Sequence, residues 1–114
     1  TQMDYEFYPQ ALEHVIRRVH KEFENAGKRM SILISENGIA TDDDTRRVQF
    51  IEEATKGVAE CIKDGIPVIG YCHWSLMDNF EWQKGFSMRF GLISVDRTTM
   101  KRTPKDSLAF LGHL

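Results

Sequence analysis

Two short apolar stretches decide the fold of this chain, SILIS at residues 31–35 and PVIGYCH at residues 67–73. Both lack the polar alternation of a half-exposed strand, which predicts β-strands that are covered on both faces. Residues 9–26 and 48–64 precede them, and in both segments apolar residues recur at the three- and four-residue steps of an amphipathic helix. The order helix, strand, helix, strand predicts a parallel sheet in an α/β protein.

The remainder of the chain is less regular. Residues 75–89 show no periodicity, although they are rich in aromatic side chains. We predict a strand at residues 91–96, a polar turn at residues 97–102, and a cap at residues 103–106 that opens a short helix ending at Leu111.

The predicted sheet is incomplete, because doubly covered parallel strands need neighbours and the chain offers at most one further short strand. A whole (β/α)₈ barrel takes about 250 residues, whereas this chain has 114. We therefore expect residues 1–114 to be the carboxyl-terminal part of a single (β/α)₈ TIM barrel domain, namely its last two βα units with a preceding helix.

Composition and charge exclude several classes of protein. Hydrophobic residues make up 41% and charged residues 28% of the chain, which is typical of a globular protein and excludes a disordered one. The 15 basic and 17 acidic residues leave no basic excess for nucleic acid. The apolar runs are far shorter than the roughly 20 residues of a membrane span. We expect a cytoplasmic protein without a signal peptide, in which Cys61 and Cys72 are buried, reduced thiols.

Acidic and aromatic residues follow both predicted strands, at the carboxyl ends where α/β proteins carry their functional groups. Glu36 follows the first strand, and Trp74, Glu81 and Trp82 follow the second. A pyranose presents an apolar face on which aromatic rings stack, and hydroxyls that carboxylates and indole N–H groups can bind. These residue types therefore favour sugar recognition.

Each feature also has a structural alternative. Glu36-Asn37-Gly38 is the composition of a solvated turn, because Asn and Gly favour positive φ. His73 has no second ligand at metal-binding spacing, so we predict a buried, hydrogen-bonded histidine and no metal. The acidic residues 42–44 predict a helix-start surface. No phosphate-loop fingerprint is present, and no cofactor is expected.

Several longer strings, taken in order, are similar to one known family. They are ENG at residues 36–38, DGIPVIGY at 64–71, WSLMDNFEW at 74–82, RFGL at 89–92, VD at 95–96 and RTPKDS at 102–107. Their order and spacing resemble the carboxyl-terminal part of glycoside hydrolase family 1, the β-glucosidase family with a (β/α)₈ barrel.

The resemblance implies a retaining β-glycosidase that acts on a β-glycoside substrate. Glu36 would be the nucleophile that forms a covalent glycosyl-enzyme. Glu81 and Trp82 would hold the outer hydroxyls of the sugar, and Trp74 and Phe90 would wall the pocket. The two stretches quoted first would be the seventh and eighth strands of the barrel.

The resemblance also concerns the substrate and the completeness of the site. Family members that hydrolyse 6-phospho-sugars place Ser, Lys and Tyr at the positions of Glu81, Met88 and Phe90, which implies a non-phosphorylated substrate here. The family's acid/base glutamate stands in an Asn-Glu-Pro string that this chain lacks. We therefore expect the chain to be inactive alone and to pair with the remaining barrel segment or another copy of itself. The alternative is a non-catalytic sugar-binding or structural remnant of such a barrel.

Overall fold

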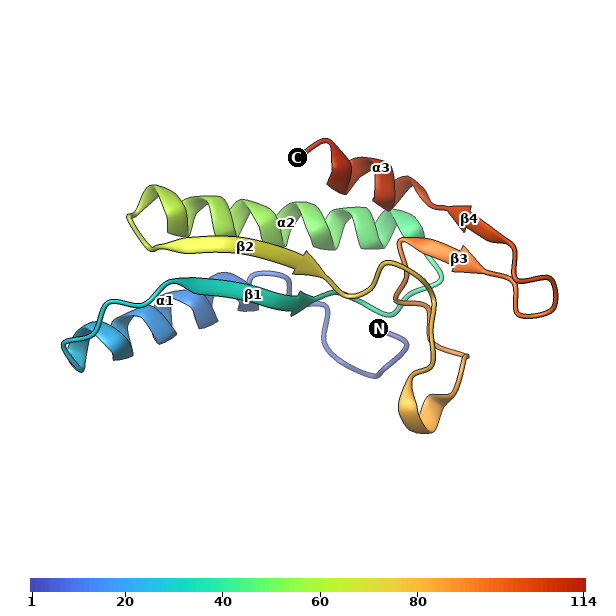
Figure 1. Cartoon of the computed structure of the whole chain (residues 1–114), viewed down its shortest axis with the longest axis horizontal. Coiled ribbons are helices and arrows are strands. Elements are labelled where there is room, and N and C mark those ends of the chain that lie inside the picture. The colour runs from blue at the N-terminus through green and yellow to red at the C-terminus, as the bar shows by residue number, and fades with distance from the viewer.

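The computed structural model describes residues 1–114 as an elongated α/β unit (Figure 1). Its helices are α1 (Ala11–Asn25), α2 (Asp44–Lys63) and α3 (Asp106–Gly112), with one short 3₁₀ helix, η1 (Trp82–Lys84). Its strands are β1 (Ile32–Asn37), β2 (Val68–His73), β3 (Ile93–Val95) and β4 (Arg102–Pro104). No helix is both long and apolar enough to cross a membrane.

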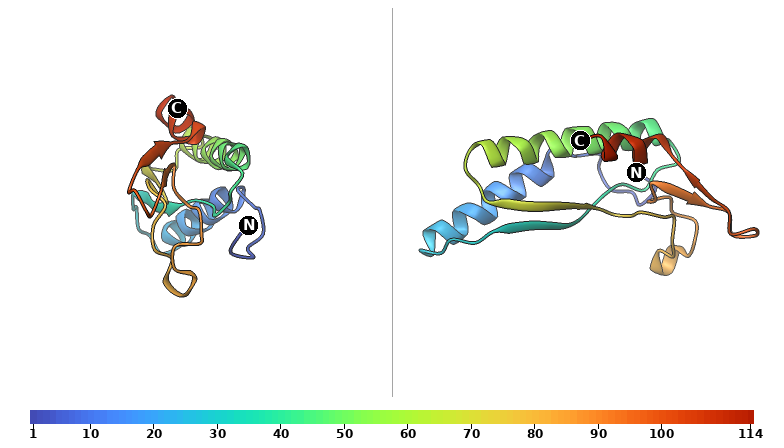
Figure 2. Two further views of the ribbon diagram at one scale, coloured as in Figure 1. Left: turned by 90° about the vertical axis from the view of Figure 1, so that its right-hand side faces the viewer. Right: turned by 45° about the horizontal axis from the view of Figure 1, so that its top comes forward.

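Strands β1 and β2 pair in parallel, with Ile34 opposite Tyr71 and Asn37 opposite His73. Helices α1 and α2 lie on the same side of these strands (Figure 2). Their packing buries the side chains of the main core, which are Ile16, Ile34, Val58, Cys61 and Ile66. The predicted parallel α/β arrangement and the buried Cys61 are confirmed.

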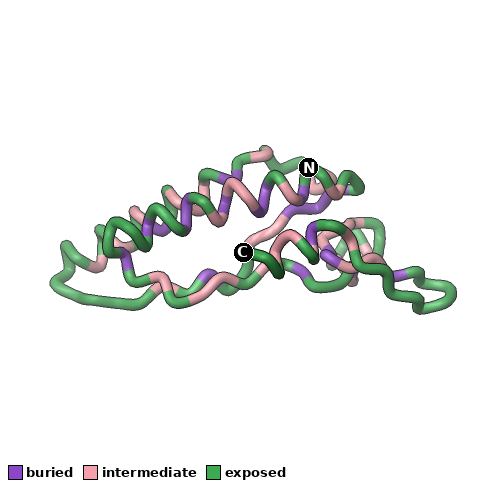
Figure 3. Tube along the Cα trace, turned by 90° about the horizontal axis from the view of Figure 1, so that it is seen from above, coloured by how far each residue is buried: buried purple, intermediate pink, exposed green.

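The other face of the strands is uncovered, so the prediction of two covered faces is wrong for this chain. Leu33 is 55% exposed and Ile69 is 68% exposed. Cys72, predicted to be buried, is exposed as well. Figure 3 shows buried residues recurring along α2, while the strands are largely half-buried or exposed. The physical reason is that the chain supplies helices for only one side of its sheet.

A separate two-stranded sheet follows, in which β3 and β4 pair antiparallel. The prediction missed β4, because residues 97–102 suggested only a turn and Thr103-Pro104 suggested a helix cap. In the structure Thr103 pairs with Ser94, and the cap of α3 is Lys105. Three exposed strand residues have no periodicity to detect, which is why the sequence pattern did not reveal them.

Candidate active site

Glu36 lies at the carboxyl end of β1, where its side chain is exposed. The strand extends two residues beyond the predicted end at Ser35, so Glu36 and Asn37 belong to β1 rather than to a turn. The main-chain N–H of Trp74 donates to the Asn37 carbonyl at 2.9 Å. Trp74, the residue after β2, is therefore hydrogen-bonded to the residue that follows Glu36 at the end of β1.

The side chain of Asn37 is also held in place. The Tyr71 hydroxyl donates to Asn37 Oδ1 at 3.0 Å. Burial raises the pKa of Tyr71 to about 12, so this hydroxyl keeps its proton at neutral pH. The residue that follows Glu36 is therefore fixed through both its backbone and its side chain.

Gly38 allows the two strand ends to approach closely. A Cβ atom at this position would lie 1.7 Å from the carbonyl oxygen of Trp74. Neither Asn37 nor Gly38 has a positive φ, so the solvated-turn explanation of this string is wrong. The glycine is needed because backbone packs against it, and the Trp74–Ser75 peptide bond that it faces is cis.

Phe90 reaches the same end of the sheet through the backbone. The N–H of Ser75 donates to the Phe90 carbonyl at 3.2 Å, and the N–H of Leu92 donates to the Ser75 carbonyl at 3.0 Å. Three of the predicted site residues, Glu36, Trp74 and Phe90, thus gather where β1 and β2 end.

Glu81 and Trp82 lie in a loop of residues 78–86 that projects from the rest of the chain (Figure 1). The Glu81 N–H donates to the Gly85 carbonyl at 2.6 Å, which closes the tip of the loop. Trp82 is 77% exposed. These two residues therefore belong to the projecting loop, whereas the other three follow or face the strand ends.

The base of this loop is fixed by a buried ion pair that sequence reasoning missed. Asp78 is 3% exposed, and its carboxylate accepts from the Gly91 N–H at 2.8 Å. Lys105 Nζ lies 3.3 Å from Asp78 Oδ1 and donates to the Gly91 carbonyl at 2.6 Å. Burial lowers the pKa of Lys105, and the Asp78 charge opposes that shift. Both residues stand in the family strings, which is the signal that could have drawn attention to them.

The acidic run at residues 42–44 does more than begin a helix. The predicted helix start is confirmed, and Asp43 caps α2, since its carboxylate accepts from the N–H groups of Thr45 and Arg46. The side chain of Asp44, however, is not part of a free surface. It accepts from Ser107 N at 2.9 Å and from Ser107 Oγ at 2.8 Å, and thereby joins the starts of α2 and α3.

Asp44 also pairs with Arg47, which is fully buried. The Arg47 guanidinium donates to the carbonyls of Thr41 and Arg89, the latter at 2.7 Å. This side chain therefore ties the loop that follows Glu36 to the residue that precedes Phe90. Position 47 precedes the predicted helical segment at residues 48–64, so the apolar periodicity did not show its burial.

His73 was predicted to be a hydrogen-bonded buried histidine, and the prediction of hydrogen bonding is wrong. Both ring nitrogens are buried without a hydrogen-bond partner. Burial lowers the pKa of His73 to about 4, so the ring is neutral at pH 7. No group of three or more His, Cys, Asp or Glu side chains is placed to hold a metal ion.

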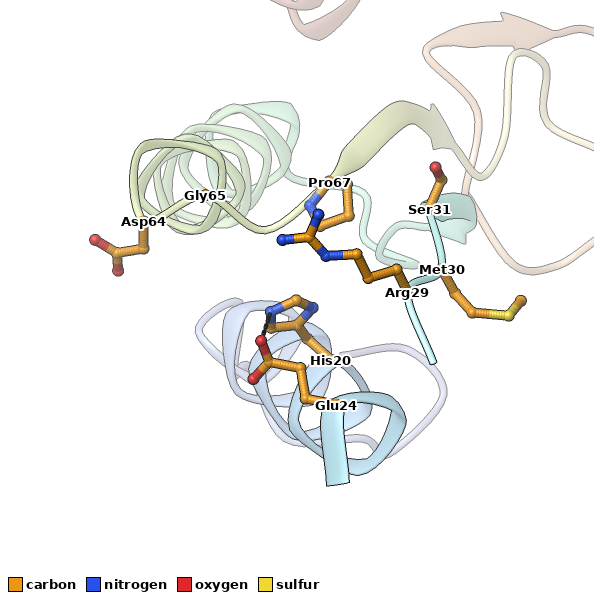
Figure 4. Close-up of a pocket in the computed structure, with 8 residues that line it drawn as sticks. All are labelled: His20, Glu24, Arg29, Met30, Ser31, Asp64, Gly65 and Pro67. Carbon is orange, nitrogen blue, oxygen red and sulfur yellow. Dashed lines mark ion pairs between the residues drawn. The ribbon is translucent and has the colours of Figure 1, made fainter. Parts of the chain in front are cut away.

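A polar pocket of about 420 Å³ lies at the opposite, amino-terminal end of β1 and β2 (Figure 4). Its lining residues are His20, Glu24, Arg29, Met30, Ser31, Asp64, Gly65 and Pro67. None of the predicted site residues lines it. The candidate active site is therefore the exposed carboxyl end of the strands, and not this hollow.

The chain is similar to known proteins along nearly its whole length. The chain is 37% identical to the 1,4-beta-D-glucan glucohydrolase of Thermotoga neapolitana, over 94% of this chain and 25% of the relative. It is 41% identical to the 6-phospho-beta-galactosidase of Leptotrichia buccalis, over 94% of this chain and 24% of that relative. The chain thus spans about a quarter of the length of the curated relatives it matches.

Solved structures match the fold closely. The apo structure of beta-glucosidase 1317 superposes with a TM-score of 0.92 at 52% identity, covering 99% of this chain and 27% of that one. The family 1 β-glucosidase of Thermotoga maritima gives a TM-score of 0.91 at 34% identity, again over 99% of this chain and 27% of the other. The two parallel strands are accordingly an arc of a TIM barrel, not a closed barrel. The family model of glycosyl hydrolase family 1 matches residues 1–114, and the chain belongs to that family.

Proposed function

We propose that this chain supplies the nucleophile and part of the sugar pocket of a retaining β-glycosidase. One observation carries the proposal: the carboxylate of Glu36 is exposed at the carboxyl end of a parallel strand. The next residue, Asn37, accepts a hydrogen bond from the Trp74 N–H. Catalytic residues of TIM barrels come from this end of the strands. Family membership supports the same reaction class.

The proposed chemistry has two steps. In the first, a Glu36 carboxylate oxygen bonds to the anomeric carbon while the glycosidic C–O bond breaks, and a second carboxylic acid protonates the leaving oxygen. In the second, that acid, now a carboxylate, takes a proton from water, and the water oxygen replaces Glu36 at the anomeric carbon. This chain has no Asn-Glu-Pro string, so we assign the acid to another part of the barrel.

We further propose a non-phosphorylated β-glucoside or related sugar as substrate. The relatives include both a glucan glucohydrolase and 6-phospho-β-galactosidases, so family membership alone does not choose between them. The choice rests on Glu81, because a carboxylate that binds sugar hydroxyls would repel a phosphate where screening is weak. Met88 and Phe90 support it, since neither is the basic or hydroxylated residue of the phospho-sugar enzymes.

The partner of this segment is the remaining barrel. Exposed Leu33 and Ile69 and the open edges of β1 and β2 are surfaces that barrel strands cover, so the segment alone should bind a complement or another copy of itself. We place the protein in the cytoplasm, where the free thiols Cys61 and Cys72 would stay reduced.

The test uses the full-length protein that contains this sequence. We expect it to hydrolyse a nitrophenyl β-glucoside faster than the same glucoside 6-phosphate, and to release the β-anomer first, as followed by NMR. A 2-fluoro β-glucoside should trap a covalent adduct on the peptide that contains Glu36, detectable by mass spectrometry. Release of the α-anomer would exclude a retaining nucleophile, and a preference for the phosphate would exclude the proposed substrate. An adduct on another residue would remove Glu36 from this role.

A further inference from the structure

Residues 78–86 form a loop that carries Glu81 and Trp82 away from the sheet (Figure 1). Its tip is closed by hydrogen bonds within the loop, such as Lys84 N–H to the Glu81 carbonyl at 2.8 Å. These internal bonds fix the shape of the tip, but they do not fix where the tip lies relative to the strands. Something outside the loop must do so if Glu81 and Trp82 are to meet a sugar bound at Glu36.

Arg97, in the turn between β3 and β4, contacts both ends of this loop. Its Nη2 donates to the main-chain carbonyl of Asp78, where the loop leaves the buried ion pair with Lys105. Its guanidinium carbon lies 4.2 Å from the centre of the Phe86 ring, where the loop returns. A planar guanidinium can make both contacts at once, because it stacks with one face and donates along its edge.

The contact with Phe86 extends across the loop. The Phe86 and Phe80 rings pack edge to face with centroids 5.4 Å apart, so the two stems are joined directly below the tip. Both rings are otherwise exposed. The stems are also tied to neighbouring residues, since Asn79 donates to Ser75 Oγ at 3.0 Å and Arg89 donates to the Phe86 carbonyl at 3.3 Å. Through Asp78 and Phe86, Arg97 therefore joins this loop to the β3–β4 turn.

We infer that Arg97 is a positioning residue, which sets the place of Glu81 and Trp82 in the sugar site by clamping both ends of the 78–86 loop. The inference rests on the function proposed above. It assigns no contact between Arg97 and the sugar, because the effect passes through the loop. A misplacement of binding groups by about 1 Å can cost on the order of 100-fold in rate.

The kinetic test compares Arg97→Met and Arg97→Lys with the unchanged full-length protein on a nitrophenyl β-glucoside. Arg97→Met should lower kcat/KM by roughly 10- to 100-fold, chiefly through a higher KM. Arg97→Lys should restore part of the loss, because it keeps the positive charge and one donor. Lys101→Met is the matched control, since Lys101 lies exposed in the same turn and its side chain makes no hydrogen bond or ion pair.

A double-mutant cycle separates positioning from general stabilisation. If Arg97 acts through the loop, Arg97→Met should cost less activity once Trp82→Ala has removed the indole, because only Glu81 then still depends on the place of the loop. An equal loss in both backgrounds, or an unchanged KM in the single variant, would overturn the inference. Where Arg97→Met does not fold, Arg97→Lys carries the same cycle.

A second readout does not depend on activity. Lys84 is exposed at the tip of the loop, so trypsin should cut after it faster in Arg97→Met than in the unchanged protein or in Lys101→Met. Equal cleavage rates in all three would show that Arg97 does not hold the loop. An unchanged protein without glycosidase activity would contradict the proposed function, while the cleavage rates would still test the clamp.

Discussion

The chain has two parts that are built differently: the sheet half, residues 9–73, and the loop half, residues 74–114. In the sheet half, regular strands and helices pack apolar side chains such as Ile34 and Ile51. In the loop half, regular structure is short, and buried Asp78 and half-buried Lys105 hold backbone carbonyls and amides. The first half thus carries the Glu36 carboxylate on a regular strand, and the second half presents surfaces held by individual polar contacts.

The largest expected effect tests the role of the sheet half. Glu36→Gln in the full-length protein should lower kcat by roughly four to six orders of magnitude, because an amide keeps the shape of the side chain but cannot attack carbon. Sugar binding, measured by titration with glucose, should change little. Glu60→Gln, on an exposed face of α2, is the matched control. Retention of most of kcat by Glu36→Gln would leave Glu36 with a structural role only.

The next prediction tests whether polar contacts hold the loop half. Asp78→Ala leaves the Lys105 ammonium without its buried partner and the Gly91 N–H without its acceptor, so unfolding should become easier by about 3 to 5 kcal/mol. Lys63→Met breaks the exposed pair with Glu60 and should leave the free energy of unfolding nearly unchanged. Urea denaturation measures both. Equal midpoints for the two variants would contradict the contrast between the halves.

A pair of glycines tests the junction of the halves. Gly38→Ala places a methyl group against the Trp74 carbonyl, so the strand ends must separate and kcat should fall on the order of 100-fold. Gly27→Ala also costs stability, roughly 1 kcal/mol, because Gly27 has a φ of 67°. That position has open space around it and precedes the amino-terminal end of β1, whereas Glu36 lies at the carboxyl end, so kcat should not change. Steady-state kinetics at 25 °C would distinguish a junction effect from general destabilisation.

The smallest expected effect concerns pH. His73 has a folded-state pKa of about 4, whereas an unfolded histidine titrates near 6.5. Between these two pH values the unfolded chain therefore binds more protons than the folded chain. The stabilisation that the neutral ring gives the fold is complete above about pH 6.5 and is lost as the pH falls towards 4. Unfolding should become easier by about 2 kcal/mol between pH 7 and pH 4.5.

The His73→Gln variant should lack this part of the pH dependence, while His113→Gln, at the exposed end of α3, should retain it. Urea denaturation at the two pH values gives the comparison. A His73→Gln profile that parallels the unchanged protein would show that the histidine does not couple the junction to pH.

Prediction from sequence succeeded where side chains repeat. The apolar periods of α1 and α2 and the runs of β1 and β2 identified the elements to within about four residues at their ends and indicated their parallel order. It failed for β4, whose three residues are exposed, and for His73, because a single sequence does not reveal which partners a buried ring lacks. Burial of Cys72 was also wrong, since cover for that face requires strands outside this chain.

For the site, the sequence was sufficient to place Glu36 and Trp74 at neighbouring strand ends, because parallel strands align their carboxyl ends. It did not predict the buried Arg47 or the clamp made by Arg97. Both act through backbone carbonyls, Thr41 and Arg89 for the first and Asp78 for the second. Contacts of side chains with backbone at long range leave no periodic pattern in a sequence.

The bond between Asp44 and Ser107 has a consequence for how the chain folds. It joins residues 63 positions apart, and contacts across such distances form late, because a long segment must first lose its freedom. Helices α1 and α2 can pack on β1 and β2 before that. The order of folding would then match the two halves of the chain. The sheet that carries Glu36 would form first, and the surroundings of Phe90 would form only when α3 docks on the start of α2.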